Sequence, residues 1–342
     1  MSKPTIKIDE IKKEILGYIA NNPSILNGAV LSAQIELNKH AKLITKVRGE
    51  YTALSSLIGH VVQAFSSEWT EIGQAQFRAK QAKSYHQKVN FAIKPADILN
   101  TIVEYMYDEG KDLKDKSVTK LIIEQLKKKI ISDVDILSQD GIYDEAKAFG
   151  DNPEFGFSMD GINEVHSKML SNTKNPCYQI PIDAIDDNNI IDVITSIERK
   201  LPKDFKKLVK KIFISQNNQE RYILAYEDRF GGNTDYKKGD KLKTRLGKRE
   251  IVTLDNMDDD KVVLFVDGNL CRFIDVVENP ATITDVQKQD YKLKLFGEFS
   301  LGYDYAMNEL VIVASPEAPH EGLGNDDLNK AIYPKQFVTI NK

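Results

Sequence analysis

Apolar residues recur at helical spacing through the N-terminal part of the chain. The first series predicts an amphipathic helix and consists of Ile8, Ile11, Ile15 and Ile19. Weaker series follow from Val30 to Val47 and from Leu54 to Val62, so residues 1–65 are predicted to be mostly helical. This region carries much apolar surface with little sign of a self-contained core. It is either a helical subdomain or an arm that packs on another unit.

The pattern changes to a period of two before Pro95. Val89, Phe91 and Ile93 alternate with polar residues, which predicts a strand. The residues before this strand are polar and short of aliphatic side chains. We therefore expect residues 66–92 to form an extended two-stranded loop that projects from the body. Loops of this length are usually either functional or disordered.

The clearest helical pattern covers residues 117–139. Apolar side chains recur at three- and four-residue intervals from Val118 to Leu137. Ser117 suits the N-cap position, and Gly141 lies just beyond the end. A helix of this length is a rod of roughly 35 Å.

The second half of the chain mixes helices and strands, so the predicted fold class is α+β. Amphipathic helices are predicted at 188–200 and 219–230. Strands are predicted at 212–215, 250–254, 261–267 and 271–277. A last pair, 291–299 and 307–313, is predicted to form an antiparallel hairpin or meander, because Gly302 and Asp304 lie in the connection.

Composition and charge narrow the class of protein. The 342 residues include 47 Lys and Arg against 51 Asp and Glu, a net charge of −4. This balance argues against a protein that coats nucleic acid through bulk positive charge. No stretch approaches the roughly 18 uncharged apolar residues of a membrane span. The two cysteines, Cys177 and Cys271, cannot supply a zinc ribbon or a disulfide framework.

No group of residues has the spacing of a catalytic or metal site. The five histidines lack a second ligand at metal-binding spacing, and the acidic run 255–260 lacks the ligand alternation of a calcium loop. We expect no catalytic residue, cofactor or metal. The basic segment 231–247 lacks phosphate-loop spacing. It nevertheless leaves one alternative open, an α+β protein that binds an anion or nucleotide there.

The order of the predicted elements, together with three stretches of sequence, resembles the major capsid protein of tailed bacteriophages, the Hong Kong phage type of fold. The stretches are SYHQKVNFAIKPADI (84–98), YKKGDKLKTRLGKREIV (236–252) and ITDVQKQDYKLKLFGEFSLGYDYAMNELVIV (283–313). They look closest to capsid proteins of phages that infect Bacteroidetes. The resemblance covers roughly residues 60–313.

The resemblance implies a division of the chain. The first parts are an N-terminal arm (1–65) that reaches a neighbouring subunit and an extended loop (66–92) over the adjacent subunit. A peripheral domain (93–180 and 275–314) contains the spine helix at 117–139. An axial domain (181–274) surrounds the five- and six-fold axes, and a C-terminal tail (315–342) ends the chain. No long scaffolding domain precedes the arm, so a separate scaffold or an already processed chain is implied.

The implied function is structural. Such a protein self-assembles, as pentamers and hexamers, into the icosahedral capsid that encloses the phage double-stranded DNA. It is not an enzyme, it works with scaffold and portal proteins, and it passes from the host cytoplasm into the virion. An encapsulin-like cargo shell on the same fold is the alternative.

The extended loop is where we expect contacts between subunits. Residues 70–94 carry a net charge of +4, whereas 183–192 and 255–260 each hold four Asp and no Lys or Arg. Complementary charge between copies would favour register and encounter more than affinity. The expected contact residues are Trp69, Phe77, Arg78, Lys80, Lys83 and Tyr85.

Overall fold

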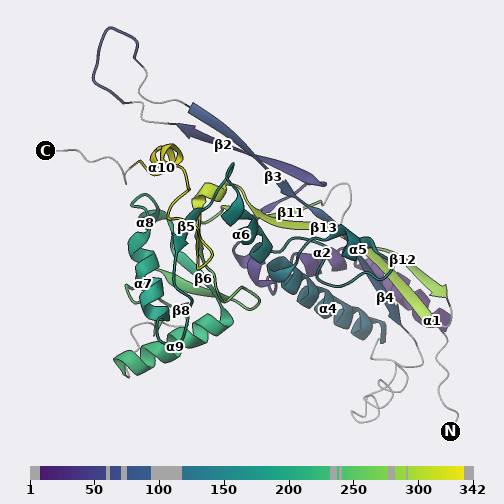
Figure 1. Cartoon of the computed structure of the whole chain (residues 1–342). Helices are drawn as coiled ribbons and strands as arrows, with labels where there is room; N and C mark the ends of the chain where they lie inside the picture. The colour runs from purple at the N-terminus through teal and green to yellow at the C-terminus, as the bar shows by residue number, and fades with distance from the viewer. Residues whose placement is uncertain are drawn as a thin grey trace.

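The computed structural model describes residues 8–58, 62–70, 75–93, 118–231, 237–238, 241–275, 282–289 and 292–334. In these ranges the chain forms two five-stranded sheets, a group of helices beside each sheet, and a ribbon that projects from the body (Figure 1). Among the described helices, none has the length and apolar character needed to cross a membrane.

The first sheet is built around one long strand. Its strands are β1 (Lys42–Ile44), β4 (Tyr85–Ile93), β11 (Leu270–Ile274), β12 (Thr282–Gln289) and β13 (Lys292–Tyr305). β13 pairs antiparallel with β4, β11 and β12, and β1 pairs parallel with β11. Leu293, Leu295 and Phe299 alternate along β13 as buried side chains. The strand predicted before Pro95 is thus confirmed as β4.

Three helices share the core of this sheet. They are α1 (Ile8–Asn21), α2 (Ile25–Val30) and α4 (Val118–Asp140). α4 confirms the long helix predicted at 117–139. Ile15, Leu26 and Leu37 are buried in the same core as Leu126 and Leu295. The chain itself therefore covers apolar side chains that we expected a neighbouring copy to cover.

The N-terminal region does not stay helical to residue 65. A short 3₁₀ helix, η1 (Glu36–Lys39), and β1 follow α2, and β2 (Glu50–Ile58) comes next. The predicted helical series from Leu54 to Val62 is therefore wrong over Leu54–Ile58. In the first part of β2, buried Ala53 lies between exposed Thr52 and Leu54. Residues 50–58 form a strand because their backbone pairs with β3 (Ala75–Lys83). The helical spacing of their apolar residues is a coincidence.

The second sheet is buried on both faces. Its order is β5 (Tyr178–Pro181), β14 (Val311–Ser315), β10 (Val262–Phe265), β6 (Lys211–Ser215) and β9 (Glu250–Leu254). One face, with Phe213, packs into the same core as the buried side chains of α4. The other face, with Ile212, packs against α7 (Ile190–Lys200) and α9 (Gln216–Phe230). The helices predicted at 188–200 and 219–230 and the strands at 212–215 and 250–254 are confirmed.

The predicted hairpin between 291–299 and 307–313 is wrong. β13 belongs to the first sheet and β14 to the second, and the chain passes between them through η2 (Asn308–Leu310). The hairpin partner of β13 is β12. The burial patterns give the reason, since β13 alternates along its first half whereas all five residues of β14 are buried. A strand apolar at every position suits a sheet covered on both faces.

The remaining elements are short. They are α5 (Glu145–Phe149), α6 (Ile162–Ser171), α8 (Phe205–Leu208), β7 (Lys237–Lys238), β8 (Lys241–Leu242) and α10 (Asp326–Ile332). β7 and β8 pair only with each other.

Candidate functional site

The projecting ribbon consists of β2 and β3, which pair antiparallel from Glu50 opposite Lys83 to Ile58 opposite Ala75 (Figure 1). We had expected a two-stranded loop at 66–92; in the structure its last strand, β4, lies instead in the first sheet. The described part of the ribbon has almost no core. Leu54 and Phe77 are each 71% exposed and are diagonal neighbours on one face of the ribbon.

The base of the ribbon lies directly on the first sheet. The chain turns from β3 into β4 at Ser84, whose backbone N–H donates to the Gly49 carbonyl at 2.6 Å. A Cβ atom at Gly302 would lie 2.2 Å from the Lys83 carbonyl oxygen. Only glycine therefore allows β13 to pass this close beneath the turn. This close approach fixes the point from which the ribbon leaves the body.

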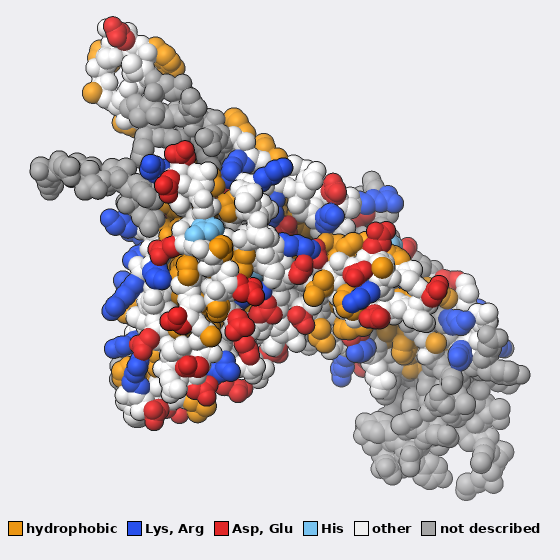
Figure 2. All heavy atoms as spheres, viewed as in Figure 1, with side chains coloured by type: hydrophobic (Ala, Val, Ile, Leu, Met, Phe, Trp, Pro, Cys, Tyr) orange, Lys and Arg blue, Asp and Glu red, His pale blue; other side chains and the backbone are white. Residues whose placement is uncertain are grey.

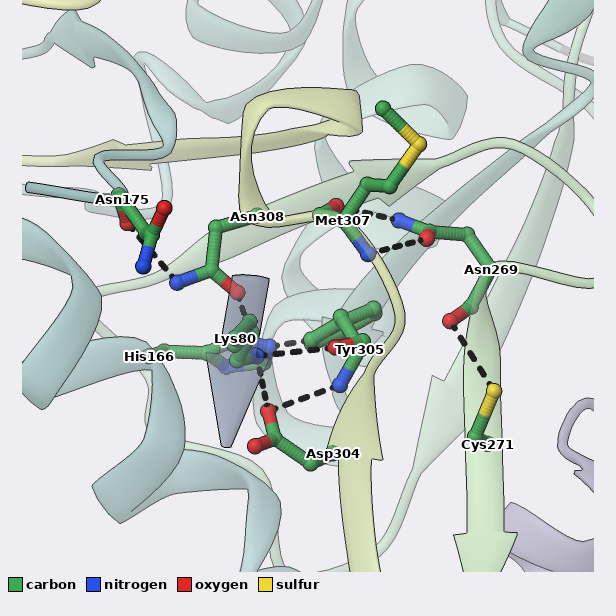
Figure 3. A network of polar contacts seen from close by, with 9 residues as sticks. All are labelled: Lys80, His166, Asn175, Asn269, Cys271, Asp304, Tyr305, Met307 and Asn308. Carbon is green, nitrogen blue, oxygen red and sulfur yellow. Dashed lines mark hydrogen bonds and ion pairs between the residues drawn. The ribbon is translucent and has the colours of Figure 1, made fainter. Parts of the chain in front are cut away.

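Lys80 ties the ribbon to the segment between the two sheets. The Lys80 ammonium forms an ion pair with Asp304, donates to the Tyr305 carbonyl at 2.8 Å and donates to Asn308 Oδ1 (Figure 3). The side chains of Lys80 and Asp304 are only 13% and 14% exposed. Burial raises the pKa of the Asp304 carboxyl, and the charge of Lys80 offsets part of that rise. All three donor positions of the ammonium have acceptors, so this lysine is an anchor.

Two further candidates also bind their own subunit. Arg78 forms an ion pair with Glu309 and donates to the Lys174 carbonyl at 2.9 Å. The Tyr85 hydroxyl donates to Asp160 at 2.5 Å. Burial tends to raise the pKa of Asp160, but hydrogen bonds from Lys168 and Tyr85 bring it below the ordinary value. Arg78, Lys80 and Tyr85 thus hold the ribbon and its base in place.

The segment 304–309, which we call the junction segment, collects contacts from distant parts of the chain (Figure 3). Asn269 exchanges two hydrogen bonds with the Met307 backbone, at 2.8 and 2.9 Å. Asn308 donates to the Asn175 carbonyl at 2.8 Å. Both sheets and the ribbon therefore meet at one polar network.

A buried histidine completes this network from α6. His166 Nε2 lies 2.9 Å from the Tyr305 hydroxyl. Burial, with a smaller contribution from Lys261, lowers the pKa of His166 to about 3. Burial also raises the pKa of Tyr305 well above its ordinary value. Both groups are therefore neutral at pH 7, and the pair is a structural contact inside the core.

The tip of the ribbon is its most exposed part. Val62, Phe65 and Trp69 are 88%, 97% and 93% exposed. Gln63 and Thr70 join the two ends of the described tip, since Gln63 Nε2 donates to the Thr70 carbonyl at 2.6 Å. Figure 2 shows hydrophobic side chains on this outlying tip, away from the body. Apolar side chains held this far from any core are typical of an interaction surface.

The six expected contact residues thus fall into two groups. Trp69, Phe77 and Lys83 are exposed, whereas the other three bind their own chain. The acceptors of Lys80 and Arg78 are not among the predicted contact residues: Asp304 and Asn308 bind Lys80, and Glu309 binds Arg78. The available signal was the run of polar residues between two apolar strands, which we had interpreted only as a hairpin connection.

The described residues contain no cluster suited to metal binding, and their two cysteines are not suited to nucleophilic chemistry. No group of three or more His, Cys, Asp or Glu in this part of the chain is placed to hold a metal ion. Both cysteines are buried, and burial raises the pKa of the Cys177 thiol to about 12. A thiol with so high a pKa has almost no thiolate at pH 7 and is a poor nucleophile.

The basic segment 231–247 is described only in part. Lys241 pairs with Glu250 at 3.0 Å, and Arg245 lies 5.0 Å from the centroid of the Phe230 ring. The adjacent Arg249 pairs with Glu198 at 2.8 Å, with both side chains buried. Lys241, Arg245 and Arg249, which are candidates for anion binding, therefore already contact side chains of their own chain.

Comparison with known proteins adds the fold. No protein-family model matches the chain, and no curated protein matches it in sequence. The capsid of cyanophage A-1(L), however, superposes with a TM-score of 0.52 at 11% identity, over 83% of this chain and 92% of that one. The chain has the tailed-phage major capsid fold. The predicted fold is confirmed.

Two other structures with lower scores are also similar to this capsid fold. The satellite phage P4 procapsid has a TM-score of 0.49 at 10% identity, over 85% of this chain and 98% of that one. The virus-like particle from Pyrococcus furiosus has a TM-score of 0.45 at 12% identity, over 87% and 99%.

Proposed function

We propose that this chain is the subunit of an icosahedral capsid that encloses the double-stranded DNA of a tailed phage. The observation that carries the proposal is the anchored ribbon. On the capsid fold, it presents an exposed aromatic tip that its own subunit leaves uncovered. A surface of this kind gains stability when a neighbouring copy covers it.

The exposed side chains of the ribbon are the intersubunit contacts in this proposal. Burying a side chain of the size of Phe contributes about 1.5–3 kcal/mol, so Phe65, Trp69 and Phe77 outweigh any exposed ion pair. Lys83, at the base, supplies a rim charge. Repetition over many subunits turns these modest contacts into a stable shell.

Further parts of the proposal concern partners and place. The shell is built of pentamers and hexamers, and it assembles with separate scaffold and portal proteins in the host cytoplasm before it becomes part of the virion. The net charge of −4 supports a container that encloses DNA without neutralising it. The proposed role is structural and without catalysis.

Electron microscopy of the purified protein, alone and with scaffold protein, tests the proposal. We expect closed icosahedral shells, and DNA in particles isolated from infected cells. A chain that stays monomeric under all these conditions contradicts a shell function. Particles filled with protein cargo instead of DNA would support the encapsulin-like alternative.

A further inference from the structure

Two surfaces beside the second sheet each present an exposed leucine among charges that are mostly of one sign. The basic edge consists of Leu208 with Arg199, Lys203, Lys206, Lys207 and Lys210. The acidic face consists of Leu224 with Glu220, Glu227 and Asp228. Leu208 is 52% exposed and Leu224 is 67% exposed. An apolar centre with a charged rim is the usual composition of a protein interface.

The packing of α8 creates the basic edge. Phe205 and Val209 are buried, which leaves Leu208 between them directed away from the core. The backbone here is held on both sides, because Arg249 donates to the Lys206 carbonyl at 3.0 Å and Lys206 Nζ donates to the Arg199 carbonyl at 3.0 Å. The lysines therefore project from a fixed turn.

The periodicity of α9 creates the acidic face. Asn218, Tyr222 and Tyr226 recur every four residues and are buried, so the opposite side of the helix faces outward. The two arginines of α9 are occupied at its flanks. Arg221 pairs with Asp187 at 3.1 Å and Arg229 with Asp192 at 2.9 Å. The charges around Leu224 are therefore predominantly negative.

The two surfaces lie on different edges of the same domain. Figure 1 places α8 high on one side and α9 along the bottom, and Figure 2 shows Lys and Arg side chains along the first edge and many Asp and Glu side chains along the second. One copy cannot bring its own two edges together, but a second copy can supply the missing partner. Contact between two unlike surfaces is heterologous, and it closes into a ring when the rotation permits.

We propose that the basic edge of one copy binds the acidic face of the next copy around a ring, with Leu208 packed beside Leu224. This inference rests on the proposed shell function and names the partner surfaces within it. The leucines form the apolar centre of the contact. The opposite charges set its register and exclude edge-to-edge and face-to-face pairing.

Charge reversal tests the pairing. The variants K203E/K206E/K207E and E220K/E227K/D228K each make the two surfaces alike in sign, and the concentration needed for assembly should rise about tenfold or more. The variant with all six substitutions keeps the native net charge and restores opposite signs, so it should assemble at the native concentration. Sedimentation velocity measures the assembled fraction, and circular dichroism checks that each variant is folded.

A mixture of the two triple variants gives a sharper result. One variant then has two acidic surfaces and the other two basic ones, so they can only alternate around a ring. Alternation closes a six-membered ring but not a five-membered one. We expect hexamers by electron microscopy, without closed shells, because the vertices of a shell need pentamers.

The outcomes separate this inference from the proposed function. If a folded triple variant forms shells at the native concentration, or if the folded sixfold variant stays defective, the pairing is wrong and the shell function stands. If the mixture forms complete shells, the pairing is also wrong. A native chain that never assembles overturns the shell function and the pairing together.

Discussion

The second sheet and the ribbon show two different ways in which this chain holds a strand. In the second sheet, Ile212 and Phe213 lie on opposite faces and each enters an apolar core of the same subunit. In the ribbon, Leu54 and Phe77 face solvent, and polar contacts at Arg78 and Lys80 fix its direction. The sheet is stable within one copy, whereas the described ribbon needs an anchor.

Because of this difference, substitutions in the two regions should affect different properties, the stability of the subunit or its assembly with other copies. A substitution in the second sheet should act on the stability of the subunit, and through it on everything else. A substitution on the outer surface of the ribbon should leave the subunit folded and act on its contacts with other copies. The anchor lies between these cases, because it is buried in the subunit but positions the assembly surface.

The largest expected effect is in the second sheet. Phe213 is 1% exposed and stacks on Phe265 with ring centroids 4.5 Å apart. Phe213→Ala leaves a cavity in the core to which side chains of both sheets contribute. It should lower the free energy of unfolding by about 3–5 kcal/mol. Chemical denaturation measures this, with Phe77→Ala on the ribbon as the matched control. Equal losses for the two variants would remove the distinction between the two regions.

The anchor should have the next largest effect. Lys80→Ala leaves Asp304 and Asn308 without their donor in a buried site, which should cost about 2–3 kcal/mol. The ribbon should also lose its fixed direction, so the amides of β3 should exchange hydrogen faster than in the native chain. Lys83→Ala, at an exposed position three residues later, is the control. Unchanged exchange in β3 would show that the ribbon does not depend on Lys80.

Acid should weaken the junction between the sheets. The pKa of His166 is lowered to about 3 in the folded chain, mainly by burial, so the unfolded chain binds more protons below pH 6.5. Stability should therefore fall as the pH drops from 6.5 toward 3, by up to about 1.4 kcal/mol per unit, or about 2 kcal/mol at pH 5. His166→Gln should reduce this slope in denaturation measured at several pH values, and His40, whose pKa burial lowers to about 4, should account for part of the slope that remains. Substitution of His86, whose ring is 56% exposed, by Gln should keep the full slope.

The parts of the fold that the sequence could predict are those with a regular local pattern. α4 was predicted at 117–139 because seven apolar residues repeat at helical spacing, and β6 was predicted because three of its five residues are apolar in a row. Strand partners were harder. β13 and β14 are both rich in apolar residues and follow one another in the sequence, but they belong to different sheets. What distinguishes them is that the first half of β13 alternates between buried and partly buried residues, whereas every residue of β14 is buried.

The anchor was beyond local pattern for the same reason. Lys80 and Asp304 are separated by 224 residues, and nothing near either residue indicates the other. The count of charged residues gave the predicted loop a net positive charge, and we expected that charge to contact other subunits. The structure shows that Arg78 and Lys80 contact Glu309 and Asp304 of their own chain. The exposure of Trp69 likewise depends on the length of the paired ribbon, which composition alone does not determine.

The smallest effect on the subunit is expected at the tip of the ribbon. Trp69 is 93% exposed, so Trp69→Ser should change the free energy of unfolding by less than about 0.5 kcal/mol. The same substitution should strongly reduce shell formation, because it removes an aromatic side chain that we propose a neighbouring copy to bury. Trp69→Phe keeps an aromatic contact and should retain most of the assembly, as measured by sedimentation and electron microscopy. If Trp69→Ser forms shells as readily as Trp69→Phe, the tip is not an assembly contact, and the ribbon must act through Leu54 and Phe77 on its side. Large destabilisation of the subunit by Trp69→Ser would instead show that the tip, like the second sheet, is part of the subunit's own fold.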